Sequence, residues 1–277
     1  MLRPKTWKIE AFAEGSLQGN PAGVVILPGQ KPWPDDEILQ SLAKDVGFLE
    51  TAYVRRQSDG KFHLRWFTPT VEVDLCGHAT LAAAFALWES ATVDSALITF
   101  TSRSGDLAVT RDPSSERITL DFPVDPPAHD FAAQSSEEIR SSLAAALGID
   151  AGRIIDCFQG KFDTVVVVND ERIIFRCAPD MAELEKFDIR GVIITARSAP
   201  ASAADFTSRF FAPKYGVPED PVTGSAHCLL GPYWAGELGV HSLIAYQASE
   251  RGGLLYLEMP PDSDRIFISG HARLMLK

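Results

Sequence analysis

The chain has 277 residues, of which 45% are hydrophobic and 23% charged, and its formal net charge is -11. This composition is typical of a globular protein with enough apolar side chains for one large or two ordinary domains. The acidic balance disfavours nonspecific binding to nucleic acid or to an anionic membrane, because both need a basic surface.

The cysteine usage and the N-terminus bear on the compartment. None of the four cysteines forms a CxxC pair, so neither a zinc ribbon nor a disulfide scaffold is indicated, and a reducing compartment is favoured. The opening stretch MLRPKTWKIEAF lacks the apolar core of a signal peptide, and no run approaches the ~18 apolar residues of a membrane span. The sequence therefore predicts a cytoplasmic protein without membrane association.

The predicted elements of the first half are strands interrupted by two helices. Apolar residues recur at helical spacing over 34–47, where Gly47 ends the helix. A hairpin turn is expected at 112–115. In chain order we expect strands at 7–13 and 22–28, a helix at 34–47, strands at 50–56 and 62–68, a helix at 79–88, and strands at 96–103, 106–112 and 116–123.

The second half begins with a segment rich in proline and small polar residues, 124–136, which we interpret as a linker. A helix with glutamates in its first turn is expected at 136–148, where Gly148 ends it. The remaining expected elements are strands at 161–170 and 172–179, a short helix at 180–188, strands at 191–197 and 205–213, a helix from about 226, and strands at 243–249, 254–260 and 265–270.

Two segments, 67–83 and 211–230, resemble each other. Both open with Phe-x-Pro, reach an aspartate, and then pass through a glycine turn and small residues into an apolar helix. Chance similarity of two short segments is one explanation. We favour an internal duplication, because self-similarity that recurs with the surrounding elements is a strong signal of repeated architecture.

Each of these turns can bind a small anion. In CGHAT and in TGSA a glycine lies where the chain enters a helix, and the first N–H groups of a helix have no internal partner and carry partial positive charge. Two such turns facing each other would hold one small anion, for which a carboxylate is the natural candidate. The alternative is two ordinary helix caps, since Thr223 and Ser225 are good capping residues.

Three side chains offer acid–base chemistry. Glu50 follows Phe48 and Leu49, and a carboxyl group among apolar side chains can pass protons near neutral pH. His78 offers an acid, a base or a hydrogen-bond donor, and Cys76 a thiol at a helix start. Each also has a purely structural interpretation, as an exposed strand end, a turn histidine or a small buried residue. His227 and Cys228 are expected in the core.

No metal or nucleotide site is predicted. The six histidines show no HxxH, HxH or HExxH spacing, and no GxGxxG or GxxxxGK[ST] loop occurs. The sequence thus predicts no metal and no cofactor.

Four motifs in order, GNPAGVV, ETAYV, FTPTVEVDLCGHAT and EDPVTGSAHC, resemble the phenazine-biosynthesis PhzF-like isomerase family. The resemblance implies an α+β, diaminopimelate-epimerase-like fold. In it, two pseudo-symmetric lobes each wrap a β-barrel-like sheet around a central helix, and the active site lies in the interlobe cleft. We expect lobes at 1–125 and 126–277, with the last strand of the chain a candidate to join the first lobe. The resemblance also favours a homodimer.

The same resemblance implies the site. The catalytic set is Glu50, His78, Asp220 and Ser225, and the substrate-binding set is Asn20, Cys76, Gly77, Ala79, Thr223 and Gly224. It implies that a glutamate moves a proton from one carbon to another of a small anionic metabolite without cofactor or metal. Related epimerases use two opposed cysteines. Here the second turn has Thr223, whose hydroxyl is far too weak an acid to replace a thiol.

Three functional hypotheses follow. The first is a cofactor-independent isomerase that acts on a small carboxylate-bearing substrate and uses Glu50 as its acid/base. The second is an epimerase or racemase that uses Cys76 with another base. The third is a non-catalytic protein of the same fold that binds a small anion or a partner. Leu49 stands where the family often has a polar residue, which leaves the substrate open.

Overall fold

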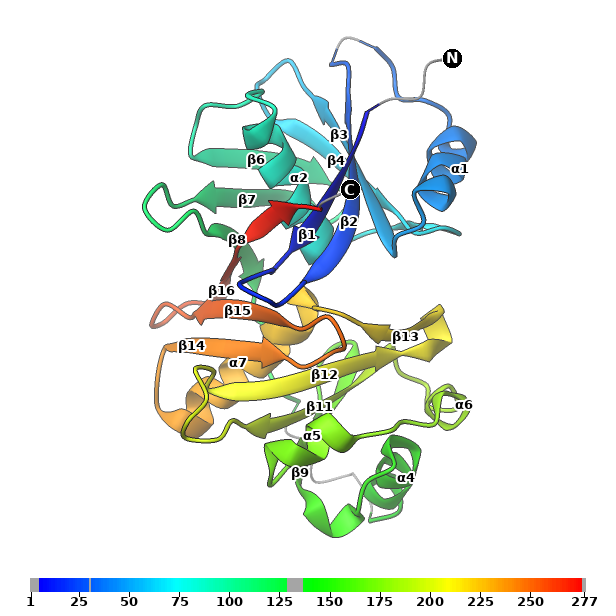
Figure 1. Cartoon of the computed structure of the whole chain (residues 1–277), viewed down its shortest axis with the longest axis vertical. Helices are drawn as coiled ribbons and strands as arrows, with labels where there is room; N and C mark the ends of the chain where they lie inside the picture. The colour runs from blue at the N-terminus through cyan, green and yellow to red at the C-terminus, as the bar shows by residue number, and fades with distance from the viewer. Residues whose placement is uncertain (1–4, 30, 129–136, 276–277) are drawn as a thin grey trace. The chain divides into compact units, whose positions relative to one another are not determined.

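The computed structural model describes residues 5–29, 31–128 and 137–275. Residues 129–136, which include most of the predicted linker and the first residue of the predicted helix at 136–148, lie outside the described residues. By packing, the chain divides into two compact units (Figure 1). The first comprises 1–122 and 267–277, and the second comprises 123–266.

The first unit is one sheet and two helices. Its strands are β1 (Thr6–Ala11), β2 (Asn20–Leu27), β3 (Glu50–Arg56), β4 (Phe62–Phe67), β5 (Glu72–Val73), β6 (Leu97–Ser102), β7 (Gly105–Arg111), β8 (Ile118–Pro123), most of β16 (Arg265–Gly270) and β17 (Ala272–Leu274). Its helices are α1 (Asp36–Val46) and α2 (Gly77–Glu89).

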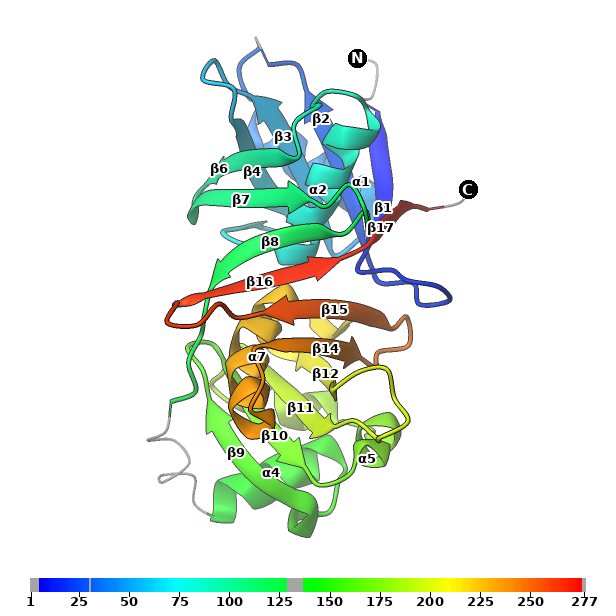
Figure 2. The same cartoon turned by 90° about the vertical axis from the view of Figure 1, so that its left-hand side faces the viewer.

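The strands of this unit form a sheet that closes on itself. Pairing runs from β17 through β1, β2, β3, β4, β6 and β7 to β8. β8 in turn pairs with β16, and the chain runs directly from β16 into β17 (Figure 2). The result is a barrel-like sheet without a free long edge between β8 and β1, which limits edge-to-edge aggregation.

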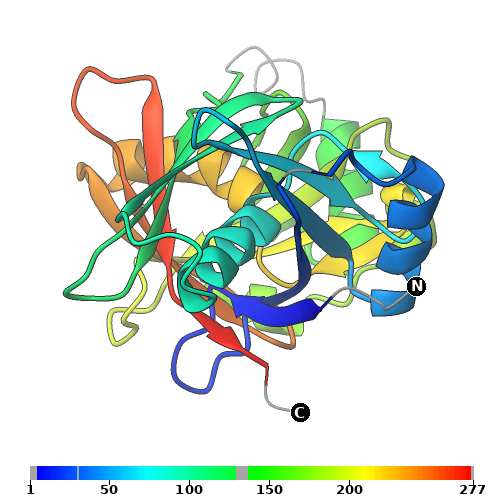
Figure 3. The same cartoon turned by 90° about the horizontal axis from the view of Figure 1, so that it is seen from above.

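Helix α2 lies inside this sheet, as the view from above shows (Figure 3). Its sequence, GHATLAAAFALWE, is apolar on all sides, and Leu81, Ala82, Ala83 and Ala84 are fully buried. A helix that is hydrophobic all round belongs in a core. The small alanine side chains let the surrounding strands approach it closely.

The second unit repeats these parts and adds short helices. Its strands are β9 (Ile154–Gln159), β10 (Asp163–Val168), β11 (Gly191–Arg197), β12 (Phe206–Ala212), β13 (Val217–Asp220), β14 (Ser242–Gln247) and β15 (Gly253–Glu258). Its helices are α4 (Glu137–Leu147), α5 (Glu171–Arg176), α6 (Met181–Leu184) and α7 (Gly224–Leu238), with 3-10 turns η1 (Ala151–Arg153) and η2 (Pro213–Tyr215).

The strand pairing of the second unit matches that of the first, strand for strand. In the first unit the pairs β1–β2, β3–β4, β4–β5 and β6–β7 are antiparallel, and the pairs β2–β3 and β4–β6 are parallel. In the second unit the corresponding pairs β9–β10, β11–β12, β12–β13 and β14–β15 are antiparallel, and β10–β11 and β12–β14 are parallel. Helix α7 follows β13 as α2 follows β5, and it is similarly buried. The similarity of 67–83 to 211–230 therefore extends over both units, as a duplication predicts.

An arginine–glutamate pair recurs at the same place in each unit. Arg65 on β4 donates two hydrogen bonds of 2.7 Å to Glu72, and Arg209 on β12 donates bonds of 2.7 and 2.9 Å to Glu219. Such two-pronged pairs are the more strongly directed kind of ion pair. Each joins the strand before the glycine turn to the segment that leads into the turn, and so fixes where the central helix begins.

One predicted strand is wrong. Residues 172–179 were expected to be extended, but helix α5 covers most of them. Asp170 caps this helix, since its side chain accepts a hydrogen bond from the Arg172 N–H at 2.9 Å, and Ile174 packs into the core. An apolar run this short fits either a strand or a buried turn of helix, and the preceding capping residue decides here. The short strands β5, β13 and β17 and the strand β9 were not predicted.

Among the helices of the described residues, none combines the length and the apolarity that a membrane span requires.

Candidate active site

The first glycine turn places two side chains at the N-terminus of α2. Cys76 is the N-cap residue with extended backbone angles, and its side chain makes no capping hydrogen bond. The Cys76 carbonyl oxygen accepts bonds from the Thr80 N–H at 3.1 Å and the Thr80 hydroxyl at 2.6 Å, which fixes the first helical turn. The N–H groups of Gly77 and His78 have no partner within the helix.

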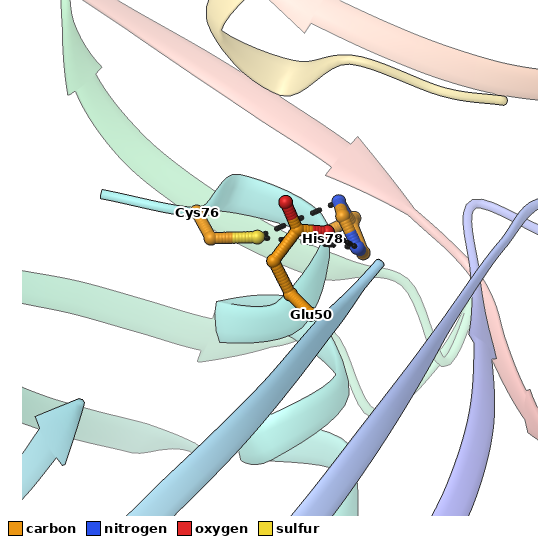
Figure 4. Close-up of side chains that lie close together, drawn as sticks. All are labelled: Glu50, Cys76 and His78. Carbon is orange, nitrogen blue, oxygen red and sulfur yellow. Dashed lines mark hydrogen bonds and ion pairs between the residues drawn. The ribbon is translucent and has the colours of Figure 1, made fainter. Parts of the chain in front are cut away.

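Glu50 reaches this turn from the sheet. It is the first residue of β3, where it lies opposite Ala22 of the parallel strand β2. Its Oε2 lies 3.3 Å from the His78 Nε2, and Figure 4 shows the carboxyl group, the imidazole and the Cys76 sulfur pointing toward one another. The carboxyl side chain is 17% exposed, whereas His78 is 4% exposed. Oε2 is buried and has no well-directed hydrogen bond in the described structure.

Asn20 holds the other edge of the imidazole. It is the first residue of β2, and its Nδ2 lies 3.1 Å from the His78 Nδ1. The Asn20 amide, turned so that its oxygen faces Nδ1, accepts the Nδ1–H of a protonated imidazole, whose Nε2–H is directed toward Glu50. Asn20 and Glu50 thus fix the ring from both sides.

The electrostatics of the cluster assign the charges. Burial by itself lowers the pKa of His78, but the neighbouring Cys76 sulfur and the Glu50 carboxylate outweigh burial and hold that pKa well above its usual value. Burial raises the pKa of the Cys76 thiol, and this effect exceeds the opposing effect of His78. We therefore assign a protonated thiol to Cys76 and a protonated imidazole to His78 at neutral pH.

The second glycine turn, in the second unit, is held by Gln247. This fully buried side chain donates to the Asp220 carbonyl at 2.7 Å and to the Thr223 hydroxyl at 3.1 Å, and its Oε1 accepts from the Thr223 N–H at 2.8 Å. The Thr223 hydroxyl donates to the Asp220 carboxylate at 2.6 Å. The sequence analysis missed Gln247, because a single glutamine at the end of a strand carries no motif.

Ser225, the second residue of α7, also has a partner that the sequence did not indicate. Arg190 donates to the Ser225 hydroxyl at 3.1 Å, and its Nε donates to Asp163 at 2.8 Å. Asp163 is 2% exposed. A carboxylate this deeply buried needs a cationic partner, which Arg190 supplies. Arg190 comes just before β11 and Asp163 begins β10, so two strand starts together position this arginine.

The predicted residues thus fall into two groups, one in each unit. In the first unit Glu50, His78, Cys76 and Asn20 come together, and Gly77 and Ala79 belong to the first turn of α2. In the second unit Asp220, Thr223, Gly224 and Ser225 belong to the second turn. Cys76 and Thr223 are both N-cap residues of the buried helices, which agrees with their alignment in the repeat.

His227 and Cys228 lie in the core of the second unit, as expected. The His227 Nδ1–H donates to the Thr223 carbonyl at 2.8 Å, and the ring stacks on Phe206 at 5.9 Å between centroids. Burial lowers the pKa of His227 to about 4, so it is neutral at physiological pH. Its hydrogen bond to Thr223 therefore links α7 to the glycine turn that precedes the helix.

The cluster in the first unit also brings together three kinds of metal ligand. One ligand atom from each of Glu50, Cys76 and His78 lies within 4.8 Å of the other two. The histidine spacing along the sequence does not reveal this grouping, because the three residues come from a strand start and a helix start.

Comparisons with known proteins agree with this architecture. The model of a family described as phenazine biosynthesis-like protein matches residues 9–277. An uncharacterized isomerase of Pseudomonas aeruginosa is 43% identical over 270 residues, which cover 97% of this chain and 95% of that protein. A solved PhzF-family phenazine biosynthesis protein from Enterococcus faecalis is 38% identical with a TM-score of 0.85, covering 98% of this chain and 96% of that one.

A more distant likeness concerns the fold alone. A probable proline racemase from Agrobacterium radiobacter has a TM-score of 0.60 at 11% identity, covering 98% of this chain and 90% of that one. The predicted α+β, epimerase-like fold of two similar lobes is therefore confirmed. Since the family model matches nearly the whole length of both units, the chain belongs to the phenazine biosynthesis-like (PhzC–PhzF) family.

Proposed function

We propose that this protein is an isomerase that moves a proton between two carbons of a small carboxylate-bearing substrate, with Glu50 as the acid/base. The observation that carries the proposal is the 3.3 Å approach of the Glu50 carboxylate to His78 at an uncapped helix N-terminus. The Pseudomonas aeruginosa relative supports the reaction class, because it is named an isomerase.

The proposed reaction needs only proton transfer. The Glu50 carboxylate takes a proton from one substrate carbon, and the bonding electrons move into the conjugated system of the substrate. The Glu50 carboxylic acid, whose proton exchanges with solvent, then protonates a second carbon, so no electrons enter or leave. The ion-pair contact of His78 with the carboxylate keeps it aimed, and the helix N–H groups of Gly77 and His78 stabilise the negative charge that develops.

The experiment is proton exchange in deuterated water. Nuclear magnetic resonance follows deuterium incorporation into a panel of dihydroaromatic and amino carboxylates incubated with the protein. Glu50→Gln should abolish exchange at constant fold, because an amide cannot accept the proton. Glu258→Gln, at an exposed position of β15, is the matched control and should exchange normally. Normal exchange by Glu50→Gln would refute the assignment, and binding without exchange would favour the non-catalytic alternative.

That one substrate binds to both glycine turns stays a prediction from the sequence. If the α7 turn binds the same substrate, Gly224→Ala should raise the KM for the substrate that Glu50 isomerises. An unchanged KM would restrict the site to the turn at α2.

A second candidate function is an epimerase that uses Cys76. It is favoured by the distance of 3.6 Å between the Cys76 sulfur and the His78 Nδ1, which is a contact a thiol base needs. Against it, burial raises the pKa of the thiol, and Thr223 cannot serve as the opposed thiol. Loss of exchange in Cys76→Ser with full exchange in Glu50→Gln would favour this second function.

A homodimer in the cytoplasm remains our expectation for the assembly and its location. Light scattering of the purified protein tests the first, since a dimer has a mass of about twice the 30.2 kDa of the chain.

A further inference from the structure

The geometry points to a second use of the same cluster: we propose that Glu50, Cys76 and His78 bind a thiophilic divalent cation such as Zn²⁺, and that the bound cation switches off proton transfer. The metal-binding part stands on the three ligand atoms alone. The inhibition part rests on the proposed function of Glu50.

The ligand set suits zinc in type and number. Zn²⁺ takes cysteine sulfur at about 2.3 Å and histidine nitrogen or carboxylate oxygen at about 2.0–2.2 Å, and sites with three protein ligands keep a fourth position for water. Thiolate and imidazole favour Zn²⁺ over Mg²⁺ and Ca²⁺, which prefer oxygen ligands alone. Glu50, Cys76 and His78 supply one oxygen, one sulfur and one nitrogen.

The distances from the His78 Nε2 to the other two ligand atoms are close to those of a tetrahedral site. With such bond lengths, a tetrahedral ion separates nitrogen from oxygen by about 3.4 Å and sulfur from nitrogen by about 3.6 Å. The His78 Nε2 lies 3.3 Å from the Glu50 Oε2 and 3.9 Å from the Cys76 sulfur. The distance between the Cys76 sulfur and the His78 Nε2 exceeds the tetrahedral value by only a few tenths of an ångström.

The surroundings favour a bound cation. The Glu50 Oε2 is buried without a well-directed hydrogen bond, so its desolvation is not compensated. A bound metal would compensate it. A thiolate and a carboxylate together balance the two charges of the ion, which makes the loaded site neutral overall. On binding, the sulfur–metal and nitrogen–metal bonds form, and the Cys76 thiol proton and the proton on the His78 Nε2 both pass to solvent.

The orientation of the ring supports the same site. Asn20 lies 3.1 Å from the His78 Nδ1. Binding of the metal through Nε2 puts the ring proton on Nδ1, where the Asn20 amide, turned so that its oxygen faces the ring, accepts it. A side chain that holds the far nitrogen of a ligating histidine typically contributes 10–100-fold to metal affinity. The 17% exposure of the Glu50 side chain gives the ion a route to the cluster from solvent.

The consequence for activity follows from the shared atoms. A carboxylate oxygen bound to a metal cannot accept a substrate proton, and an imidazole nitrogen bound to it cannot hydrogen-bond to Glu50. Zinc should therefore inhibit isomerisation, and a chelator should restore it.

The test uses the full chain, stripped of metal and titrated with Zn²⁺ and with Co²⁺ as a spectroscopic probe. We expect one tight Zn²⁺ site by calorimetry, and for Co²⁺ a thiolate charge-transfer band with the intense visible bands of tetrahedral coordination. X-ray absorption of the zinc-loaded protein should show one sulfur at about 2.3 Å besides nitrogen or oxygen neighbours at about 2.0–2.2 Å. A zinc environment without sulfur in the wild-type chain would overturn the proposal without any variant.

Two cysteine variants localise the site. Cys76→Ala should remove the charge-transfer band and weaken Zn²⁺ binding by at least about tenfold, since a lost ligand costs no less than a lost second-sphere contact. Cys157→Ala is the matched control, because Cys157 is an equally buried free thiol on β9 and should bind Zn²⁺ as the wild type does. Undiminished Zn²⁺ affinity in Cys76→Ala would refute the site.

The outcomes separate this proposal from the proposed function. If Glu50→Gln exchanges normally while the wild type shows the cobalt–thiolate band, the acid/base assignment fails and the metal site stands. If zinc binds through Cys76 and exchange continues undiminished, the inhibition is refuted.

Discussion

His78 and His227 lie near the starts of the two buried helices, and their surroundings give them opposite proton affinities. His78 has the Glu50 carboxylate beside it, and its pKa is held well above the usual value despite burial. His227 has a backbone carbonyl and an aromatic ring as neighbours, and burial lowers its pKa to about 4. The difference suits His78 to proton transfer and His227 to a structural role.

His227 should make the fold sensitive to acid. Its folded-state pKa of about 4 lies below the ordinary 6.5, so the unfolded chain takes up a proton first as the pH falls. Its contribution to the free energy of unfolding is therefore lost between about pH 6.5 and 4, by about 3 kcal/mol in all. Denaturant unfolding across this range should show a shallower pH dependence for His227→Gln. Equal slopes for variant and wild type would contradict the assignment.

At the level of single residues, the sequence identified the groups with reactive chemistry but not the ones that hold them. Glu50, Cys76 and His78 were all named, and the structure brings them into contact. Gln247 and Arg190 were missed, although they fix the second turn through several hydrogen bonds. Their role comes from tertiary contacts across strands, and such contacts leave no local pattern in the sequence.

The connection between β1 and β2 depends on one glycine. Gly19 has φ of +60°, and an added Cβ would lie 2.1 Å from the Ala11 carbonyl oxygen. Gly19→Ala should therefore destabilise the protein by at least about 3 kcal/mol. The added Cβ forces the backbone of Ala11 to move, and the positive φ adds strain of its own. Gly15 has φ of +57° with nothing within 4 Å of an added Cβ, so Gly15→Ala should cost only about 1 kcal/mol. Equal losses in thermal unfolding would refute the clash.

The ion pair between the starts of β10 and β11 should be sensitive to loss of its cation. Arg190→Met leaves Asp163 buried and unpaired, which we expect to cost about 2–3 kcal/mol, below the range for fully buried pairs because Arg190 is 31% exposed. Asp163→Asn combined with Arg190→Met should recover most of this loss.

The pH dependence of the same variant has a definite sign. Burial already raises the pKa of Asp163, and without Arg190 the pKa should rise further. A raised folded-state pKa of an acid means that stability is lost as the pH rises from about 3.8 through the folded value. Chemical unfolding should therefore find the Arg190→Met defect larger at pH 7 than at pH 4.5, and a defect independent of pH would count against the buried charge.

Elements with strong local signals were predicted well. The helix expected at 34–47 is α1, ended by Gly47 with φ of 76°, and the helix expected at 79–88 is α2 with two earlier residues. The error at α5 has a physical reason. The short apolar run within α5 carries too little periodicity to separate strand from helix, and the Asp170 cap together with the packing of Ile174 decides.

At the scale of the molecule, the sequence repeat covered only seventeen residues of the first unit, yet the matched pairing of β1–β7 and β9–β15 extends it across both units. Beyond these segments the sequence showed the repeat only as an order of expected elements, because buried strands accept many apolar side chains and so lose sequence similarity while they keep their pairing. The lobe boundary at 125 remains a prediction.

The first unit should depend on the end of the chain. β17 pairs with β1, and β16 with β8, so residues 5–123 alone leave both strands with open edges. We expect this fragment not to fold. A circular permutant that places 265–277 before residue 5 through a short Gly/Ser linker restores both pairings, because β17 and β1 are antiparallel neighbours. Circular dichroism and amide exchange compare the two, and a stable 5–123 fragment would contradict the expectation.

The return of the last strands also orders events on the ribosome. Residues 123–266 can complete their own unit while the strands that close the first barrel are still to be synthesised. The N-terminal half must therefore wait, with α2 incompletely enclosed, until β16 and β17 have been synthesised. During that interval its apolar helix is a natural substrate for chaperones, and the middle of the chain becomes protease-resistant before the beginning does.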